Sequence, residues 1–450
     1  MISVIGTGYV GLVSGTCFAE MGFKVTCIDI NKKKIADLKR GIIPIYEPGL
    51  EDLVKKNVKE KRLNFTSSLE EGVKGKKIIF IAVGTPTHPE TGLADLKYIM
   101  AVAEELATKL KDNSLIVIKS TVPVGTGKKV KELIEKKNPK LIFHMVSNPE
   151  FLREGNAIQD FMHPDRIVVG ASSEKAITDM RRLYQLMIDK EVPVLFTDVQ
   201  TAELTKYASN AFLATKIAFV NEMADLCEKS GANIDDVSMG MGLDPRIGKD
   251  YLKPGPGYGG SCFPKDTLAL LKTSEIYKRP TKIVEAVIHS NDRRKVNMAK
   301  KIIKACGGNV KGKTIAVLGL AFKANTDDVR ESSALVIVEE LLKAGAIIQA
   351  HDPEAMHEAE KLIKGKVSYE VNSYEALAKA DAAVVITEWE EFKNIELPKA
   401  RQIMKKPVVV DLRNIFSRKE MKALGFDYYS LGKRAVIQEK IKKLKYSKRV

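Results

Sequence analysis

The sequence predicts an α/β protein with two doubly wound, Rossmann-like domains joined by a long central helix and a helical segment. Over the first 195 residues, short apolar runs alternate with longer amphipathic stretches. From Thr201 the pattern becomes continuously helical, and the alternation resumes at Lys313. Alternation of this kind is typical of a mostly parallel sheet with helices on its faces. We therefore divide the chain into residues 1–195, a central helical domain of residues 196–305, and residues 306–450.

Ten short apolar runs are the expected strands of the two α/β domains. Those of the first domain are Ile2–Ile5, Lys24–Ile28, Ile78–Val83, Leu115–Lys119, Ile142–Ser147 and Ile167–Val169. Those of the last domain are Thr314–Leu318, Ala346–Ala350, Ala382–Ile386 and Pro407–Asp411. Between them, the segment from Thr201 to about Ser230 is expected to form the long helix, and the rest of the central domain shows no strand pattern.

The composition is that of a globular protein, with 44% hydrophobic and 29% charged residues. No run approaches the ~18 apolar residues of a membrane span, so no membrane association is expected. The five cysteines are scattered and form no Cys-x-x-Cys pair, so we expect neither a disulfide framework nor a metal site. Because Met1 leads directly into a strand-like run, we expect no signal peptide and a cytoplasmic location.

The net charge of +16 is compatible with a nucleic-acid partner. Most lysines, however, are spread among glutamates on expected helix faces, and the clearest basic run is the tail from Lys440 to Arg449. Solvated faces and terminal tails commonly show this pattern, so we expect no specific nucleic-acid binding. A positive field would also attract a polyanionic substrate.

The segment after the first expected strand carries the spacing Gly-x-Gly-x-x-Gly over residues 6–11. An acidic residue, Asp29, follows about 20 residues later at the end of the second expected strand, which is the context of a dinucleotide-binding site. The helix N-terminus faces the phosphates, and the acid holds the ribose hydroxyls and repels a 2′-phosphate, which favours NAD over NADP. The residues expected to contact NAD here are Gly6, Gly8, Val10, Gly11, Asp29 and Lys34.

Two later strand ends carry hydroxyl residues, Thr85 and Thr121, and ligands in open α/β sheets lie outside the carboxyl ends of strands. We therefore expect both threonines to line the cofactor cleft. The last domain differs, because its first expected strand is followed by one glycine, Gly319, without the fingerprint. Lys323 would suit a phosphate there, and Asp352 stands either at the position of a ribose-binding acid or in a turn.

The run from Pro254 to Asp266 places Cys262 where a glycine-rich loop meets an expected helix, Lys265 to Leu271. Pro264 suits a first helical turn, so Cys262 would lie by the positive end of the helix dipole, and Lys265 adds a full positive charge. Both effects favour the thiolate, which is the nucleophile. We therefore predict covalent catalysis of acyl or carbonyl chemistry rather than a buried structural cysteine.

These motifs together resemble the UDP-glucose/GDP-mannose dehydrogenase family, and within it the UDP-glucose 6-dehydrogenases. The matching segments occur in family order over nearly the whole chain except the basic tail: residues 6–11, 84–86, 120–126, 148–155, 206–210, 221–222, 257–266, 318–323, 330–331 and 387–389. The resemblance implies oxidation of UDP-glucose at C6 to UDP-glucuronate with two NAD⁺ and no metal, through a thiohemiacetal and a thioester on Cys262. It also implies that the central domain carries part of the active site and that the last domain binds the nucleotide sugar.

The resemblance further implies roles for single residues. Lys206 and Asn210, spaced i and i+4 on the expected long helix, would stabilise the developing oxyanion and orient the sugar. Asp266, Thr121 and Glu150 would position or activate water, and which of them is the general base stays open. Further NAD contacts are implied for Glu154, Lys265 and Arg330. Substrate contacts are implied for Glu150, Phe151, Leu152, Arg153, Glu154, Lys206, Asn210, Tyr251, Leu252, Lys253, Pro254, Gly255, Gly259, Lys323 and Arg413.

Arg246 resembles an arginine that reaches the sugar of a neighbouring subunit, so the resemblance implies at least a homodimer joined through the central helices. Two other substrates of the family stay open, GDP-mannose and UDP-N-acetyl-mannosamine. Enzymes for the latter usually have a His-Cys pair after the glycine loop, whereas this chain has Ser261 before Cys262, which favours UDP-glucose. A non-catalytic polyanion-binding protein would be a different class, and it predicts the loss of Cys262, Lys206 or Asp266, which are all present.

Overall fold

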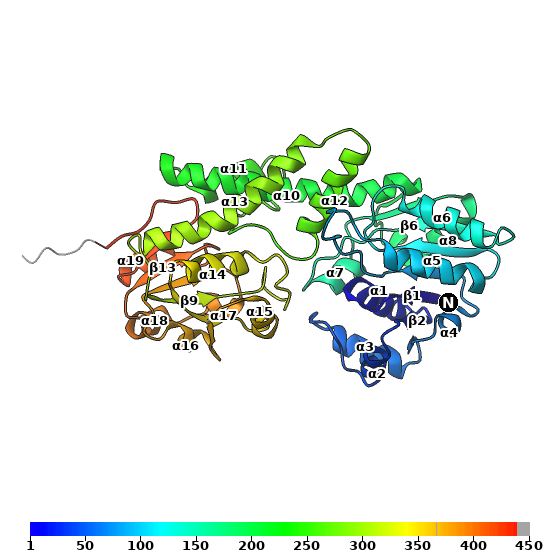
Figure 1. Cartoon of the computed structure of the whole chain (residues 1–450), viewed down its shortest axis with the longest axis horizontal. Coiled ribbons are helices and arrows are strands. Elements are labelled where there is room, and N and C mark those ends of the chain that lie inside the picture. Colours follow the sequence, from blue (N-terminus) through cyan, green and yellow to red (C-terminus); the bar gives the residue numbers. More distant parts are fainter. Residues whose placement is uncertain (366, 439–450) are drawn as a thin grey trace, which may run out of the picture. The chain divides into compact units, whose positions relative to one another are not determined.

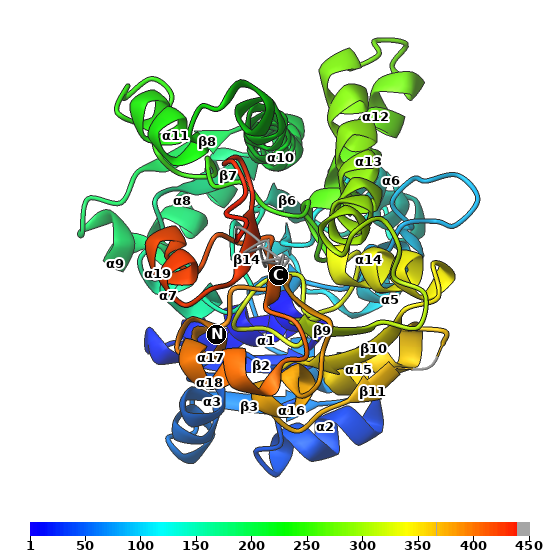
Figure 2. The ribbon, with the colours of Figure 1, turned by 90° about the vertical axis from the view of Figure 1, so that its left-hand side faces the viewer.

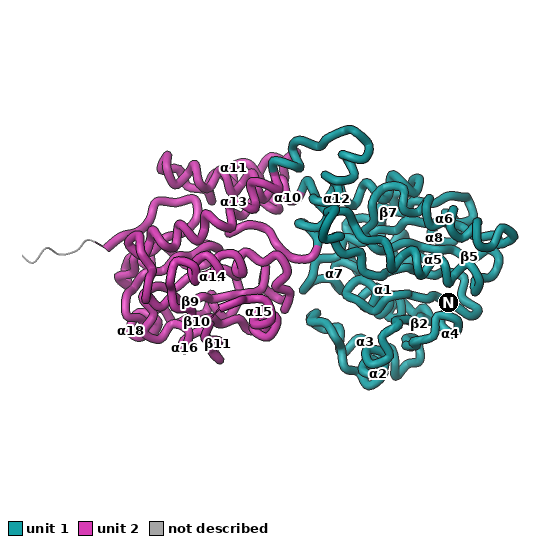
Figure 3. Tube along the Cα trace, viewed as in Figure 1, with its two compact units in different colours: residues 1–212, 262–286 teal, residues 213–261, 287–450 magenta. Residues whose placement is uncertain are grey.

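The protein is described from a computed structural model over residues 1–365 and 367–438, so the basic tail lies outside the described residues (Figure 1). The described residues form two compact units (Figure 3). Unit 1 contains Met1–Phe212 and Cys262–Ala286, and unit 2 contains Leu213–Ser261 and the described residues from Val287 onward. Each unit thus combines two separate stretches of the chain. The domain borders after residues 195 and 305 stay a prediction.

Among the described residues, unit 1 holds one sheet of eight strands in the order β3-β2-β1-β4-β5-β6-β7-β8. All neighbouring strands are parallel except β6 and β7, which confirms the predicted mostly parallel sheet. Its first six strands have the order of dinucleotide-binding folds. The strands are β1 (Ile2–Ile5), β2 (Val25–Ile28), β3 (Leu63–Thr66), β4 (Ile78–Ile81), β5 (Ser114–Ile118), β6 (Phe143–Ser147), β7 (Ile167–Ala171) and β8 (Val194–Thr197).

Helices cover both faces of this sheet. Successive residues of a strand point to opposite faces, so both faces carry apolar side chains that the helices bury. Phe80 of β4 packs on one face against Phe18 of α1, with ring centroids 5.0 Å apart. Its neighbours Ile79 and Ile81 belong to the core of the other face, together with Ile99 of α5. The helices are α1 (Tyr9–Glu20), α2 (Lys32–Lys39), α3 (Leu50–Lys59), α4 (Leu69–Val73), α5 (Lys97–Lys109), α6 (Thr126–Lys137), α7 (Ala157–Met162), α8 (Glu174–Leu183) and α9 (Gln185–Ile188).

The long helix predicted from Thr201 is α10 (Val199–Ser230), which has 32 residues and contains neither glycine nor proline. It ends before Gly231, whose φ of +88° suits a glycine at the end of a helix. The other helices of the central segment are α11 (Ile234–Gly242), α12 (Phe263–Ile276) and α13 (Lys282–Ala305). In the part of the chain that the structure describes, no helix is long and apolar enough to cross a bilayer.

Unit 2 holds a parallel sheet in which the described strands have the order β11-β10-β9-β12-β13-β14. This is the same order as in the first six strands of unit 1, and α14 and α16 lie on opposite faces of the sheet (Figure 2). The strands are β9 (Thr314–Leu318), β10 (Ile347–His351), β11 (Val367–Tyr369), β12 (Ala382–Val385), β13 (Val408–Asp411) and β14 (Asp427–Ser430). The helices are α14 (Ser333–Lys343), α15 (Met356–Leu362), α16 (Ser373–Leu377), α17 (Glu390–Lys393), α18 (Leu397–Ile403) and α19 (Arg418–Ala423).

Four described strands were not predicted from the sequence: β3, β8, β11 and β14. All four lie at the edge of a sheet. An edge strand is covered less completely than a central one, so its residues need not form a continuous apolar run. Asn64 of β3 and Leu195 of β8, for example, are exposed. The predicted central strands are present, with ends that differ by one or two residues.

The turn after β9 repeats the backbone of the turn after β1. Gly6 and Gly319 both have a φ of +100°, and each donates its N–H to the last residue of the neighbouring strand. The acid beside the second turn, Asp352, differs from Asp29 beside the first. Asp352 is fully buried and accepts hydrogen bonds from the N–H groups of Leu320 and Ala321 and from the indole of Trp389. The N–H groups of Glu354 and Ala355 also donate to it. Asp352 is thus a structural residue of the turn.

We predict that Asp352→Ala lowers the free energy of unfolding of unit 2 by about 3 kcal/mol or more, because several buried donors lose their acceptor. Urea unfolding followed by fluorescence of Trp389, the only tryptophan of the chain, measures the change. The exposed neighbour Glu354 provides the control, since Glu354→Ala should change the free energy by less than about 0.5 kcal/mol. Equal stability of the two variants would contradict the structural role of Asp352.

Candidate active site

The turn between β1 and α1 has the shape that a pyrophosphate group requires. The left-handed φ of Gly6 excludes most side chains, and a Cβ at Gly11 would lie 1.9 Å from the carbonyl oxygen of Gly6. No atom lies within 4 Å of the place where a Cβ of Gly8 would stand. Gly8 is also the N-cap of α1, which has no side-chain cap and no acidic residue in its first turn. The first N–H groups of α1 are therefore accessible to an anion.

Asp29 lies beside this turn, at the end of β2. Its carboxylate accepts hydrogen bonds from the N–H of Thr7 at 3.0 Å and the hydroxyl of Thr7 at 2.7 Å, and the amine of Lys34 lies 3.5 Å away. Burial raises the pKa of Asp29, but the hydrogen bonds from Asn31 and Thr7 and the charge of Lys34 outweigh it, so the pKa is below its usual value. The predicted ribose-binding acid is thus held as an anion. The role of Thr7 was not predicted, because its spacing in the sequence does not indicate it.

Thr85 and Thr121 lie at the carboxyl ends of the adjacent strands β4 and β5. The hydroxyl of Thr85 donates to the carbonyl oxygen of Thr121 at 2.9 Å. Ser120 donates in the same way to the carbonyl oxygen of Val83 at 2.7 Å. Side-chain hydroxyls thus tie the two strand ends together, and the two predicted threonines lie side by side.

Cys262 is the N-cap of α12 and is half-buried, and the sequence predicted it close to the start of this helix. Pro264 stands in the first helical turn, and the N–H of Asp266 donates to the carbonyl oxygen of Cys262 at 2.8 Å. The helix is longer than predicted, since it continues to Ile276. The sulfur thus lies at the positive end of a helix of 14 residues, which favours the thiolate.

Five polar residues near Cys262 in unit 1 form two sets of contacts, and this group of residues is called the network below. Lys206 and Glu150, which are 3% and 5% exposed, form an ion pair with 3.2 Å between Nζ and Oε1. Asp266, which is 1% exposed, accepts from Nδ2 of Asn210 at 2.6 Å and from Nζ of Lys265 at 2.6 Å. The structure therefore brings together residues from the end of β6, from α10 and from α12.

The charges of this network keep Lys206 protonated. Burial lowers the pKa of Lys206, but the charges of Glu150, Cys262 and Asp266 together outweigh burial, so the pKa is above its usual value. Cys262 thus lies close enough to Lys206 for the two groups to interact electrostatically. A permanent ammonium group beside a thiol can stabilise both a thiolate and an oxyanion that forms next to it.

The segment after Glu150 forms a loop that reaches α7. Phe151 lies under two cations, with its ring centroid 5.2 Å from Nζ of Lys206 and 3.8 Å from the guanidinium of Arg166. Leu152 donates its N–H to Glu150, whereas Arg153 is exposed and pairs with Asp160. Glu154, predicted to contact both ligands, is half-buried in the same loop.

A residue that the sequence analysis missed, Glu47, anchors this loop. Its buried carboxylate accepts hydrogen bonds from the N–H groups of Gly155 and Ala157, each at 2.7 Å, and from the hydroxyl of Tyr9. Tyr9 belongs to the first turn of α1, so Glu47 connects the predicted cofactor helix to the predicted substrate loop. Glu47 was not predicted because it lies more than 100 residues before Gly155 and Ala157, and no spacing in the sequence indicates such a distant contact.

In unit 2, the glycine-rich loop is held by side chains of α10 and α13. Gly255 donates its N–H to Asn221 at 2.8 Å and accepts from Arg294 at 3.0 Å. Asn291 pairs with both the N–H and the carbonyl of Tyr258, at 2.8 and 3.1 Å. A Cβ at Gly259 would lie 2.3 Å from the carbonyl oxygen of Glu331, so this position requires glycine. Asn291 and Arg294 were not predicted, because they are polar positions within a helix pattern.

The other predicted substrate residues of unit 2 differ in how far they are buried. Arg413 is partly buried, donates to the carbonyl oxygens of Ile386 and Phe322, and pairs with Glu388 at 2.8 Å. Leu252 and Pro254 are buried. Tyr251 has a φ of +63°, Lys323 lies 5.6 Å from the ring centroid of Phe322, and Lys253 is exposed.

Two predicted arginines are paired with nearby acids at the surface. Arg246 forms an ion pair with Asp244 and has a side chain that is 88% exposed. Arg330 pairs with Asp328, and its carbonyl oxygen accepts the N–H of Gly260. In each case an acid two residues earlier in the chain orients the guanidinium, so a ligand would have to compete with this pair.

Comparison with known proteins places these features in one family. Three family models of UDP-glucose/GDP-mannose dehydrogenases match the chain: the NAD binding domain over residues 1–188, the central domain over 200–293 and the UDP binding domain over 316–418. A UDP-glucose 6-dehydrogenase of Rhizobium meliloti is 52% identical over 434 residues, which cover 96% of this chain and 99% of the relative. One of Bacillus subtilis is 50% identical over 436 residues, which cover 97% of this chain and 94% of the relative.

A solved structure supports the same assignment. The UDP-glucose dehydrogenase of Pyrobaculum islandicum aligns with a TM-score of 0.87 at 38% identity, covering 96% of this chain and 98% of that one. All predicted site residues lie within the three ranges that the family models match. The chain therefore belongs to the UDP-glucose/GDP-mannose dehydrogenase family.

Proposed function

We propose that this protein oxidises UDP-glucose at C6 to UDP-glucuronate with NAD⁺, and that Cys262 carries the intermediate. The observation that supports the role of Cys262 is its place at the N-terminus of α12, within electrostatic reach of the buried Lys206. A thiol in such surroundings reacts as a thiolate and can attack a carbonyl carbon. The names of the relatives in the comparison support UDP-glucose as the substrate.

The residues of unit 1 fit NAD. The accessible N-terminus of α1 suits the pyrophosphate, and the anionic Asp29 suits an adenosine ribose without a 2′-phosphate. When bound, NAD⁺ accepts a hydride from C6 in each of the two oxidations, so two molecules are reduced for each sugar. We propose that Thr85, Thr121, Glu154 and Lys265 also contact the bound NAD.

In the first oxidation, the C6 hydroxyl loses its proton while the C6–H bond breaks, which gives an aldehyde. Negative charge develops on the C6 oxygen during this step. Lys206 and Asn210 project from one face of α10 and are fixed by Glu150 and Asp266, so they can donate hydrogen bonds to that oxygen without rearranging. A pre-oriented donor of this kind stabilises a transition state by about 3–4 kcal/mol.

Cys262 then keeps the aldehyde bound until the second oxidation. Its Sγ adds to the aldehyde carbon, and the oxygen takes up a proton, which gives a thiohemiacetal. Loss of that proton and of the second hydride gives a thioester. Water adds to the thioester carbon, the C–S bond breaks, and the products are the carboxylate, a proton and the free thiol. We propose that Asp266, Thr121 and Glu150 orient the water.

We further propose that residues 306–450 and the glycine-rich loop bind the nucleotide sugar. The loop is anchored from α10 and α13, and Lys323 and Arg413 supply positive charge at the carboxyl end of the sheet of unit 2. Arg153, Phe151, Leu152 and the segment from Tyr251 to Gly255 are the other proposed substrate contacts. Because the mechanism requires a reduced thiol, the cytoplasm is the compartment that we propose.

The protein is also proposed to form a homodimer through α10. Four large apolar side chains are exposed along this helix at intervals of seven or eight residues, which places them on one face. They are Leu204, Phe212, Phe219 and Leu226, and between 45% and 66% of each is exposed. A continuous apolar stripe of this kind favours burial against a second copy of the same chain. We propose that Arg246 then serves the active site of the partner.

We predict that the purified protein reduces two NAD⁺ for each UDP-glucose, without added metal. A panel of UDP-glucose, GDP-mannose and UDP-N-acetyl-mannosamine, followed by NADH absorbance, identifies the substrate, and UDP-glucose is expected to have the highest kcat/KM. One NADH for each sugar would contradict the double oxidation, and a preference for another sugar would correct the substrate.

We predict that Cys262→Ser lowers the rate of acid formation at least about a thousandfold while NAD and UDP-glucose still bind, because the intermediate can no longer form on sulfur. Steady-state rates and calorimetric titrations measure the two effects. Cys306 is a half-buried cysteine outside the proposed site and provides the control, since Cys306→Ser should keep full activity. Full activity of the Cys262 variant would remove this residue from the mechanism.

We predict that Phe212→Glu converts the dimer to monomers, because a charge replaces an apolar side chain in the centre of the stripe on α10. Sedimentation velocity at several concentrations measures the mass. Ile142 is similarly exposed, at 58%, but lies before β6, so Ile142→Glu should leave the mass unchanged. A wild-type monomer at all concentrations would overturn the proposed dimer.

A further inference from the structure

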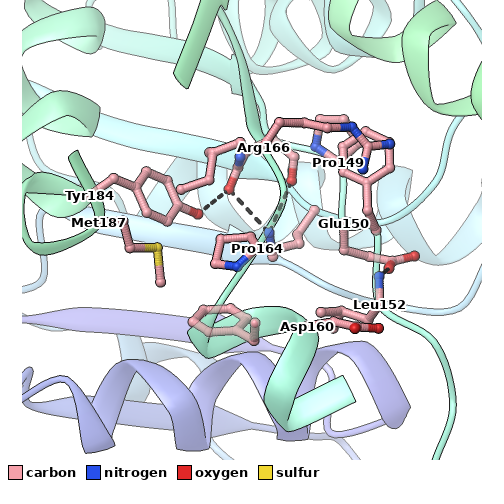
Figure 4. Close-up of a pocket in the computed structure, with 13 residues that line it drawn as sticks. Pro149, Glu150, Leu152, Asp160, Pro164, Arg166, Tyr184 and Met187 are labelled. Carbon is pink, nitrogen blue, oxygen red and sulfur yellow. Dashed lines mark hydrogen bonds between the residues drawn. The ribbon is translucent and has the colours of Figure 1, made fainter. Parts of the chain in front are cut away.

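Unit 1 contains a second buried lysine for which the mechanism above has no role. Lys119 directly follows β5 and is 4% exposed. Its Nζ donates to two atoms of Asn148, the side-chain oxygen at 3.2 Å and the carbonyl oxygen at 3.4 Å (dashed lines in Figure 4). Asn148 stands two residues before Glu150, so Lys119 contacts the segment that carries the partner of Lys206.

Asn148 is fixed from two further sides. The hydroxyl of Tyr184 donates to its side-chain oxygen at 2.6 Å, and its own amide donates to the carbonyl oxygen of Val168 at 2.8 Å. The backbone turn from Asn148 to Glu150 therefore rests on a buried polar network. The ammonium of Lys119 is the only charged group among the three side chains of that network.

A small cavity adjoins this network. Its volume is about 40 Å³, and Lys119, Asn148, Glu150, Arg166 and Tyr184 are among the residues that line it (Figure 4). A cavity of this size has room for a bound water molecule, and several of the lining residues carry polar groups. Lys119 has three N–H donors, and Asn148 accepts from it at two positions. Lys119 and Glu150 both line this cavity.

The electrostatic surroundings of Lys119 differ from those of Lys206. Burial lowers the pKa of Lys119 to about 8, although the charge of Glu150 raises it, and the charge of Lys206 lowers it further. The other charged groups that line the cavity are Asp160, which pairs with Arg153, and Arg166, which stacks on Phe151. Lys119 therefore changes its charge near pH 8.

We propose that Lys119 is a positioning residue for the oxidation: its ammonium holds the turn from Asn148 to Glu150 and keeps the carboxylate of Glu150 directed at Lys206. The inference rests on the proposed function, because it assigns Lys206 to the reacting oxygen. The charge of Glu150 acts on both lysines, and the ion pair is with Lys206. When Lys119 loses its proton, its hydrogen bonds to Asn148 weaken, so the turn that carries Glu150 is held less firmly.

The proposal predicts how the rate depends on pH. Lys119 loses its proton as the pH rises through about 8, so its contribution to kcat is present below this pH and lost above it. We expect Lys119→Met to lower kcat roughly tenfold at pH 7 with an unchanged KM for NAD. The ratio of the wild-type kcat to that of Lys119→Met should fall towards one above pH 9. NADH absorbance at saturating substrates from pH 6.5 to 9.5 measures this ratio.

Two further variants separate the charge from the packing. Lys119→Arg keeps its charge at all these pH values, and the adjoining cavity has space for the larger side chain. The ratio of its kcat to that of the wild type should therefore rise through pH 8. Tyr184→Phe removes a hydrogen bond to the same Asn148 without changing any charge, so its kcat ratio to the wild type should not depend on pH.

A ratio between the wild type and Lys119→Met that is constant over this range would overturn the proposal. Equal pH dependence of Tyr184→Phe and Lys119→Met would also overturn it, since Lys119 would then act only by packing. If Lys119→Met does not fold, the Lys119→Arg ratio decides, and a constant value contradicts the proposal. An enzyme that still forms two NADH for each sugar but shows constant ratios would disprove the role of Lys119 and leave the proposed function intact.

Discussion

An ammonium group that has left water stays charged only if nearby anions replace its hydration, and this requirement governs the interior of unit 1. Lys206 meets the requirement through its ion pair with Glu150, and Cys262 and Asp266 add further negative charge. Asp266 is in turn paired with Lys265. Electrostatic attraction between these opposite charges therefore holds the side chains in place. The orientation of the groups around the thiol follows from this mutual compensation.

The fold supplies these groups from distant parts of the chain. A strand end provides Glu150, the unbroken helix α10 provides Lys206, and the start of α12 provides Cys262 and Asp266. Rigid elements hold the charged groups, whereas the loops are fixed by single buried side chains such as Glu47. This division explains why the network can stay ordered although more than fifty residues separate Glu150 from Lys206 and Lys206 from Cys262.

The sequence was sufficient where function depends on local spacing. The turn at Gly6, the acid at Asp29 and the helix that begins after Cys262 all depend on residues that are close in the chain or follow a strand, and the fold class was predicted for the same reason. The edge strands were missed because they need no continuous apolar run. Glu47 and Asn291 were missed because their partners lie in other elements, so only the folded chain brings donor and acceptor together.

The two related turns of the chain show what decides whether such a turn can recognise a ribose. A carboxylate has about four lone pairs that can accept hydrogen bonds. Asp352 receives five donors from its own domain, so no acceptor capacity is left for a sugar hydroxyl. On Asp29, one oxygen receives only the N–H of Asn31. Transferring dinucleotide recognition to the second turn would therefore require removing internal donors such as the indole of Trp389, and not merely restoring the missing glycines.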